Sequence, residues 1–169
     1  MKVLFVCLGN ICRSPTAEAV LRKLAVEKGL SGRLKVDSAG TNGFHIGQSP
    51  DPRSIKFAAK RGIDLTPLRG RQIERADFDR FDYVIAMDNE NVRQLTALCP
   101  ASMQGKISLL LGYADRCNYR EVPDPYYGGE REFELVMDLI ESGCRGLLDQ
   151  LVGDGLVLDA DRLQARKHV

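Results

Sequence analysis

A nine-residue stretch near the N-terminus combines a thiol, a guanidinium and a backbone suited to holding an anion. It reads Cys7-Leu8-Gly9-Asn10-Ile11-Cys12-Arg13-Ser14-Pro15. The stretch joins a buried apolar run directly to a helix-like segment, so several backbone N–H groups can turn inward and the positive end of the helix dipole faces the hollow. Gly9 and Asn10 tolerate the positive φ that such a turn needs. We therefore predict a phosphate-binding loop over residues 8–14.

Cys7 and Arg13 are the two residues of this loop with the strongest chemistry. Arg13 offers a planar fork for two oxygens of a phosphate. The positive potential of the loop favours the thiolate form of Cys7, and Ser14 can donate a hydrogen bond to the same sulfur. This arrangement suits covalent attack of Cys7 on a phosphate monoester. The nucleotide motifs GxxxxGK[ST] and GxGxxG are absent.

A thiolate that attacks phosphorus needs a proton donor for the leaving oxygen, and Asp124 is the best candidate. It lies in the sequence VPDPYYGG, residues 122–129, where a proline on each side stiffens the loop. Rigidity suits a general acid, which must stay within hydrogen-bond reach of the leaving group. Asp-Pro and Gly-Gly pairs are also ordinary turn chemistry, so a purely turn-forming role stays open. Tyr126 and Tyr127 could border an aromatic substrate.

The elements that must position these residues follow a β-α-β alternation. Apolar runs predict strands over 2–7, 35–39, 83–87 and 107–111, and amphipathic segments predict helices over 14–27, 51–60, 89–98 and 133–151. This order predicts an α/β fold, an open four-stranded parallel sheet with helices on both faces. Ligands in such folds bind beyond the carboxyl ends of the strands, which is where Cys7 would lie.

Length and charge narrow the function further. The chain has 169 residues, a length typical of one domain, which we place at 1–152, with 153–169 as a C-terminal extension whose order the sequence does not predict. Its 24 basic and 23 acidic residues nearly cancel, so no net field selects nucleic acid or a membrane as a partner. No apolar stretch approaches the roughly 18 residues of a membrane span, and we expect a cytoplasmic protein.

Cysteine usage argues against disulfide and metal frameworks. Five cysteines are an odd number, and their spacing matches neither a disulfide scaffold nor paired zinc ligands. Only two histidines accompany them. We expect reduced thiols, no bound metal and no cofactor.

The phosphate-binding loop, together with Asp124-Pro125-Tyr126, closely resembles the low-molecular-weight protein tyrosine phosphatases. The resemblance covers roughly residues 1–152. It extends through Asp37-Ser38-Ala39-Gly40-Thr41, Pro50-Asp51-Pro52-Arg53, Arg71-Gln72, and Met87-Asp88 with Asn91. It implies the fold of that family, four parallel strands flanked by helices, in agreement with the pattern above.

The resemblance also implies residue roles. Cys7 would be the nucleophile, Arg13 would bind the phosphoryl group, and Asp124 would act first as acid and then as base. Cys12 would be a second, redox-active cysteine, able to capture an oxidised Cys7 as a disulfide if the loop curls tightly. Its alternative is a packing role behind the loop.

Two further groups of residues follow from the same resemblance. Asn10, Ser14 and Ser38 match residues that brace the loop by hydrogen bonds, and Phe44 falls where members place an aromatic residue on the rim. Leu68 stands where many members carry a histidine that supports the loop asparagine, so the bracing of Asn10 needs another source.

We therefore predict a phosphatase that hydrolyses phosphotyrosine in proteins and small aryl phosphates through a cysteinyl-phosphate intermediate, with inorganic phosphate as product and inhibitor. Three alternatives stay open. Arsenate reductases of similar architecture relay oxidation through two further cysteines, and Cys99 has no such partner. Protein arginine phosphatases carry threonine at the position of Ile11. A phosphate-binding module without turnover would need neither Cys7 nor Asp124.

Overall fold

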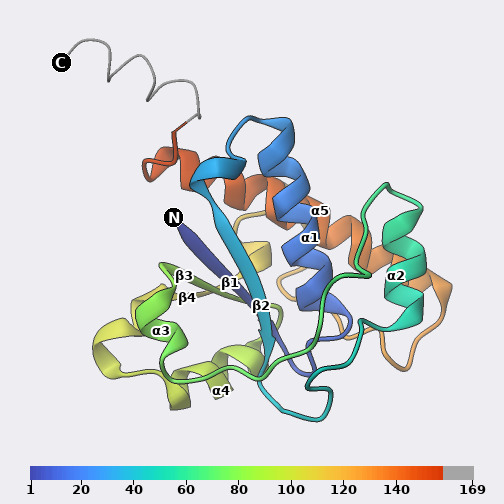
Figure 1. Cartoon of the computed structure of the whole chain (residues 1–169), viewed down its shortest axis with the longest axis horizontal. Helices are drawn as coiled ribbons and strands as arrows, with labels where there is room; N and C mark the ends of the chain where they lie inside the picture. Colours follow the sequence, from blue (N-terminus) through green and yellow to red (C-terminus); the bar gives the residue numbers. More distant parts are fainter. Residues whose placement is uncertain (158–169) are drawn as a thin grey trace.

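Four parallel strands form the centre of the computed structural model, which describes residues 1–157 of the chain. They are β1 (Lys2–Cys7), β2 (Lys35–Gly40), β3 (Tyr83–Ala86) and β4 (Ile107–Leu109). Their order in the sheet is β2-β1-β3-β4, so the direction of winding reverses between β1 and β3 (Figure 1). The predicted open, four-stranded parallel sheet is confirmed.

The helices lie on both faces of this sheet, as predicted (Figure 1). They are α1 (Arg13–Glu27), α2 (Pro52–Ala59), α3 (Asp77–Arg80), α4 (Asn89–Leu98) and α5 (Glu130–Gly153). Helices α1 and α5 cover one face and α3 and α4 the other, whereas α2 packs beside α5, away from the sheet.

Several predicted boundaries were wrong. The short helix α3 had no sequence prediction, and α5 begins at Glu130 instead of 133 because Glu132 caps its first turn by accepting from the N–H of Gly129. Strand β3 ends at Ala86, and β4 ends at Leu109 because the chain there turns into a 3₁₀ helix, Leu110–Gly112. Further 3₁₀ helices occupy Ser31–Arg33 and Ala101–Lys106.

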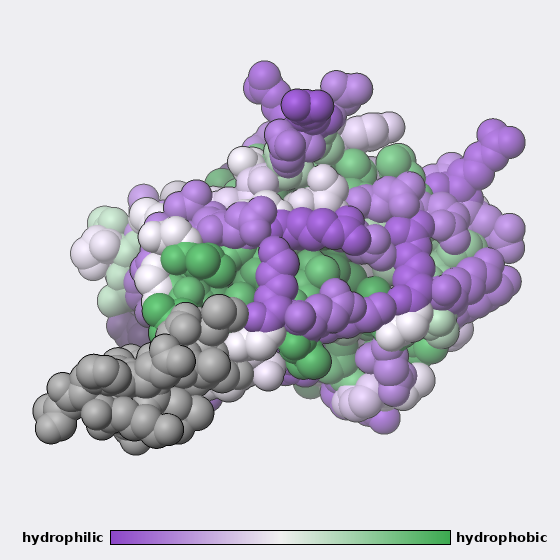
Figure 2. Space-filling model, turned by 90° about the horizontal axis from the view of Figure 1, so that it is seen from above, coloured by the Kyte–Doolittle hydropathy of each residue, from purple (hydrophilic) through white to green (hydrophobic). Residues whose placement is uncertain are grey.

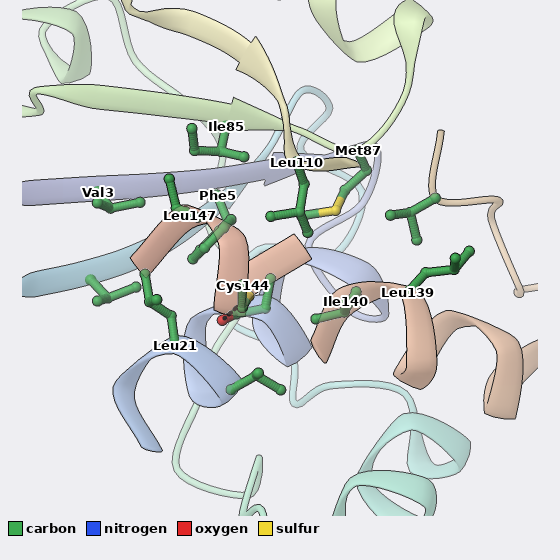
Figure 3. Packing of buried hydrophobic residues seen from close by; sticks show 14 of the residues in the cluster. Val3, Phe5, Leu21, Ile85, Met87, Leu110, Leu139, Ile140, Cys144 and Leu147 are labelled. Atoms are coloured by element: carbon green, nitrogen blue, oxygen red, sulfur yellow. Dashed lines mark hydrogen bonds between the residues drawn. The ribbon is translucent and has the colours of Figure 1, made fainter. Parts of the chain in front are cut away.

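Strand β1 is held between two apolar cores. Side chains alternate along a strand, so Val3 and Phe5 face α1 and α5, whereas Leu4 and Val6 face the α3 and α4 side. All four side chains are fully buried. Figure 3 shows the first core, where labelled residues of β1, α1 and α5 converge. The strand that carries the predicted nucleophile at its end is therefore fixed from both sides.

The chain beyond α5 continues this packing for a few residues. Leu156 is buried and belongs to the first core. Residues 158–169 lie outside the described part of the chain, so the predicted extension over 153–169 stays a prediction. On the face seen from above, apolar areas are narrow and crossed by hydrophilic side chains (Figure 2).

Residues 1–157 lack two features that the sequence analysis considered. In this range no helix is both long and apolar enough to cross a membrane. Within the same residues, no group of three or more His, Cys, Asp and Glu side chains is arranged to hold a metal ion.

Two of the three glycines of helix α5, Gly146 and Gly153, should affect stability in opposite directions when each is replaced by alanine. At Gly146 a Cβ atom would lie 1.7 Å from the carbonyl oxygen of Tyr113, whereas at Gly153 it would meet nothing within 4 Å. Backbone cannot give way as a side chain can, so Gly146→Ala should lower the free energy of unfolding by about 3 kcal/mol. Gly153→Ala should raise it by about 0.5 kcal/mol through lower backbone entropy of the unfolded chain. Urea titration of both variants measures this, and equal midpoints would contradict it.

Candidate active site

The predicted phosphate-binding loop over residues 8–14, here called the anion loop, lies between the carboxyl end of β1 and the start of α1. Cys7 is the last residue of β1 and is 2% exposed, and α1 begins at Arg13. The residues between them curl back through Asn10, which adopts a φ of 56° and is itself buried. Asparagine is one of the few L-residues that tolerate this left-handed conformation. The loop thus closes a small hollow at the N-terminus of α1.

The side chain of Asn10 locks this loop shape with three hydrogen bonds. Its Nδ2 donates to Ser14 Oγ at 2.8 Å and to Ser38 Oγ at 3.0 Å. Its Oδ1 accepts from the backbone N–H of Arg71 at 3.0 Å. A buried amide whose donors and acceptor are all used holds one geometry, because any other would leave polar groups unsatisfied.

Arg71 accounts for the missing histidine. The Leu68 side chain has no polar atom that could form a hydrogen bond to Asn10. The backbone N–H of Arg71 donates to Asn10 instead. The Arg71 guanidinium is itself fixed, donating from Nε to Asp37 at 3.1 Å and from Nη1 to the buried Asp77 at 3.0 Å. Sequence reasoning did not assign this role, since a backbone donor leaves no signature in residue types.

Ser14 connects the bracing to the sulfur. Its Oγ lies 2.9 Å from Cys7 Sγ and 3.4 Å from the carbonyl oxygen of Ala39. Because Oγ already accepts from Asn10, its own hydrogen is available to the nearer of these two acceptors, Cys7. A hydrogen bond of this kind stabilises a thiolate.

Arg13 lies beside Cys7 at the base of the hollow and is 2% exposed. Its Nη1 donates to Asp88 Oδ2 at 2.6 Å and to the carbonyl oxygen of Val122 at 3.0 Å. Although burial opposes the charge, the neighbouring Cys7, Asp88 and Asp124 raise the pKa of Arg13, so the guanidinium stays protonated. With both hydrogens of Nη1 used, the edge formed by Nε and Nη2 is the fork that can hold phosphate oxygens.

Asp88 is a site residue whose contact with Arg13 the sequence analysis missed. It is the N-cap of α4, where Oδ1 accepts from the backbone N–H of Asn91 at 2.8 Å. The Asp-x-x-Asn spacing indicates this cap. Nothing in the sequence indicates that the second carboxylate oxygen binds Arg13, which is 75 residues away.

Asp124 lies at the mouth of the hollow, within reach of Arg13. Its Oδ2 is 3.5 Å from Arg13 Nη2, and its Oδ1 accepts from the backbone N–H of Tyr126 at 3.1 Å. Its loop is tied to the sheet, since Val122 N–H donates to the carbonyl oxygen of Met87 at 2.8 Å. The carboxylate thus shapes a turn and also faces the pocket, so the two roles weighed from the sequence are compatible.

These groups line one pocket of about 400 Å³. Cys7 and Arg13 contribute from its floor, and three aromatic side chains contribute from its rim, namely Phe44, Tyr126 and Tyr127. Phe44 is 81% exposed and Tyr127 is 97% exposed, so both rings are free to contact a ligand. His45, which the sequence analysis did not assign, also lines the pocket. The size and apolar rim suit one aryl ring above an anion site.

Cys12 occupies the side of the loop turned toward α2. It is 5% exposed, and burial raises the pKa of its thiol to about 12. The residue is therefore a neutral thiol near Cys7, and no disulfide joins the two. The remaining loop residues that were predicted to bind phosphate, Leu8, Gly9 and Ile11, also line the pocket.

Comparisons with known proteins all match this chain to one family. The family model for "Low molecular weight phosphotyrosine protein phosphatase" matches residues 2–156. The chain is 47% identical over 148 residues to the low molecular weight protein-tyrosine-phosphatase YfkJ of Bacillus subtilis, covering 88% of this chain and 94% of that protein. It is 42% identical over 154 residues to the human low molecular weight phosphotyrosine protein phosphatase, with the same two coverages.

A solved structure agrees with these sequence matches. The crystal structure of a protein tyrosine phosphatase from Entamoeba histolytica with Hepes in the active site superimposes with a TM-score of 0.89 at 43% identity. The match covers 92% of this chain and 99% of that chain.

Substitutions of Asn10 test whether its hydrogen bonds and its left-handed conformation hold the shape of the loop. Asn10→Ala should lose the three hydrogen bonds and also suffer the steric cost of positive φ, about 1 kcal/mol. Asn10→Gly should lose the hydrogen bonds alone. We expect both variants to bind inorganic phosphate about 10-fold more weakly, and the alanine variant to melt at the lower temperature. Thermal denaturation with and without phosphate measures both quantities, and unchanged phosphate affinity in the two variants would contradict the bracing role.

Proposed function

The chain belongs to the low molecular weight phosphotyrosine protein phosphatase family, and we propose that Cys7, Arg13 and Asp124 carry out its hydrolysis of phosphotyrosine. One observation carries this assignment. A single pocket brings together a thiol hydrogen-bonded to Ser14, a buried guanidinium, and a carboxylate 3.5 Å from Nη2 of that guanidinium. These are a nucleophile, an oxyanion binder and an acid, the parts that transfer of a phosphoryl group requires.

The first step forms a covalent intermediate. The thiolate of Cys7 attacks phosphorus opposite the ester oxygen, and the P–O bond to the phenol breaks. Arg13 and the inward-facing N–H groups of the loop hold the non-bridging oxygens, where charge is greatest in the transition state. Asp124, as the carboxylic acid, gives its proton to the leaving phenolate. The products are cysteinyl phosphate, a free phenol and a carboxylate at Asp124.

The second step reverses the role of Asp124. Its carboxylate takes a proton from a water molecule, and the resulting hydroxide attacks the phosphorus of the cysteinyl phosphate. The S–P bond breaks, so Cys7 returns to the thiolate and inorganic phosphate is released. Because this product fits the same loop, phosphate should compete with substrate.

The rim indicates the class of substrate. Phe44 and the edge-to-face pair of Tyr126 and Tyr127, whose ring centroids are 4.9 Å apart, can flank a phenyl ring. This supports phosphotyrosine in exposed protein segments and small aryl phosphates as substrates. We place the enzyme in the cytoplasm, with no cofactor, nucleic acid or membrane as partner.

The three alternatives have weaker support. The proteins that this chain resembles are named as tyrosine phosphatases, and none of the comparisons favours arsenate reduction, arginine phosphatase activity or binding without turnover. The joint presence of a nucleophile and an acid in one pocket also favours turnover over binding alone.

Cys12 gives the proposed enzyme a response to peroxide. Oxidation of the Cys7 thiolate by hydrogen peroxide yields a sulfenic acid, and attack by the Cys12 sulfur expels water to form a disulfide. Burial keeps the Cys12 thiol neutral, so Cys7 is the sulfur that oxidises first. The disulfide would protect Cys7 from irreversible oxidation and would block catalysis until it is reduced.

Removal of the acid tests the catalytic assignment. Asp124→Ala should lower kcat/KM for phenyl phosphate by about 10²- to 10⁴-fold, and less for p-nitrophenyl phosphate, whose leaving group needs little protonation. Cys7→Ser should abolish turnover of both substrates, because serine is far harder to ionise than cysteine. Steady-state rates for both esters separate these outcomes. Equal slowing of the two esters by Asp124→Ala would leave Asp124 a turn residue only.

The redox role of Cys12 has its own experiment. After peroxide inactivation, dithiothreitol should restore the wild type but restore Cys12→Ser much less, and the oxidised wild type should be lighter by about two hydrogens. Cys117→Ser, which changes a half-buried cysteine outside the pocket, serves as the control and should recover like wild type. If Cys12→Ser recovers fully as well, Cys12 is a packing residue.

A further inference from the structure

Arg53, in the first turn of α2, hydrogen-bonds both to Asp51, which precedes the helix, and to Tyr126, which is 73 residues away in the loop that carries Asp124. Its Nε and Nη2 donate to the two carboxylate oxygens of Asp51 at 3.0 and 2.9 Å. The same Nη2 donates to the carbonyl oxygen of Tyr126 at 2.9 Å. The resemblance included Arg53 only as part of a matching segment, and the mechanism above does not use it.

Asp51 ties one end of this connection to the anion loop. Its backbone N–H donates to the carbonyl oxygen of Ile11 at 2.8 Å, and its Oδ1 caps α2 by accepting from the N–H of Arg53 at 2.8 Å. The side chain is buried, and the hydrogen bonds from Arg53 lower the pKa of Asp51, so it stays a carboxylate. Arg53 is therefore held from the side of the loop that carries the nucleophile.

Tyr126 ties the other end to the acid. Its carbonyl oxygen accepts from Arg53, and its N–H donates to Asp124 Oδ1 at 3.1 Å. The guanidinium carbon lies 5.5 Å from the centroid of the Tyr126 ring and 4.7 Å from that of Phe133 in α5. These ring contacts fix the plane of the guanidinium. Arg53 thus immobilises the residue whose backbone orients the carboxylate of Asp124.

We propose that Arg53 is a positioning residue that sets the placement of Asp124 relative to Cys7. It does so by joining the loop of residues 122–129 that carries Asp124, the acid loop, to the anion loop. The inference rests on the proposed role of Asp124 as general acid. Proton transfer requires hydrogen-bond reach, and a displacement of about 1 Å can cost up to about 100-fold in rate. Asp124 itself is 42% exposed, so its own packing does not hold it rigidly.

The guanidinium is the feature that makes this connection. One planar group satisfies both oxygens of Asp51, reaches the Tyr126 carbonyl and lies against two rings. A lysine at this position has one nitrogen and no flat face, so it cannot make all of these contacts at once. Arg53→Lys keeps the charge and removes the fork, and Arg53→Met keeps the apolar stem and removes both.

Arg61 offers a matched control for a purely structural effect. It follows the same helix, α2, and attaches it to α5 through Glu134 at 2.7 Å, Asp138 at 2.8 Å and Glu141 at 3.3 Å. Arg61→Lys therefore loosens α2 on α5 without touching the acid loop. If Arg53 only stabilised α2, variants at the two positions should behave alike.

The test measures kcat/KM for aryl phosphates whose phenols span a wide range of pKa, up to about 10 for a tyrosine-like phenol. Arg53→Lys should lose about 10-fold on the least acidic phenol and less than about 2-fold on the most acidic one, because only the former needs a well-placed acid. Arg61→Lys should change all esters by one common factor. If Arg53→Lys fails to fold, Arg53→Met is measured in its place, with thermal denaturation reporting the folded state.

A double variant separates this inference from the proposed function. In Asp124→Ala, the further change Arg53→Lys should have no added effect on any ester, because the acid that it positions is gone. If Asp124→Ala slows all esters equally, the general-acid assignment fails. If Asp124→Ala slows them unequally but the Arg53 variants slow them equally or not at all, the acid role stands and the positioning role of Arg53 is overturned.

Discussion

The contact between the buried Arg13 and the partly exposed Asp88 joins the parts of the molecule that meet at the pocket. Arg13 is the first residue of α1, and Asp88 caps α4 on the other face of the sheet. The Arg13 nitrogen that donates to Asp88 also donates to the carbonyl oxygen of Val122, which lies in the acid loop. A guanidinium that is 2% exposed cannot exchange these partners for water, so its orientation is set by the fold. Removing one partner of such a pair leaves an uncompensated buried charge, typically at a cost of about 3–5 kcal/mol. The residue that we propose binds phosphate is therefore also a residue on which the arrangement of three segments depends.

The loop around Cys7 obeys a similar constraint on a smaller scale. Every polar group of the Asn10 side chain is hydrogen-bonded, to Ser14, to Ser38 or to the backbone of Arg71. Asn10 adopts a left-handed conformation in this arrangement. Because these loop atoms are held in place, they do not have to reorganise when charge develops on a phosphoryl group during its transfer. This absence of reorganisation is the main reason why fixed dipoles lower the barrier of a reaction. The proposed role of Arg53 extends the same principle to the loop that carries Asp124, whose own side chain is 42% exposed.

Local features of this fold could be predicted from the sequence, whereas contacts between distant residues could not. The strands, the strand-to-helix loop and the thiol-guanidinium spacing are local features, and the structure has them where the residue types predicted, except that β3 and β4 end earlier. The 3₁₀ turn at Leu110–Gly112 was missed because an apolar run looks the same in a strand and in a buried turn. The contacts of Arg13 with Asp88, of Asn10 with Arg71, and of Arg53 with Tyr126 span 61 to 75 residues, and two of the three use backbone atoms. Pairings of that kind depend on the tertiary fold and leave no pattern along the chain.

The 3.5 Å approach of Asp124 to Arg13 has a consequence for which esters the pocket accepts. In the proposed mechanism Arg13 transfers its Nη2 contact from Asp124 to the bound phosphoryl group, and Asp124 then carries the proton that the leaving oxygen receives. A phosphate monoester at neutral pH carries close to two negative charges and gains from the exchange. A phosphodiester or a sulfate ester carries one and gains little. In the proposed mechanism, the ion pair between Arg13 and Asp124 would therefore favour monoesters over diesters by charge, before any clash of shape.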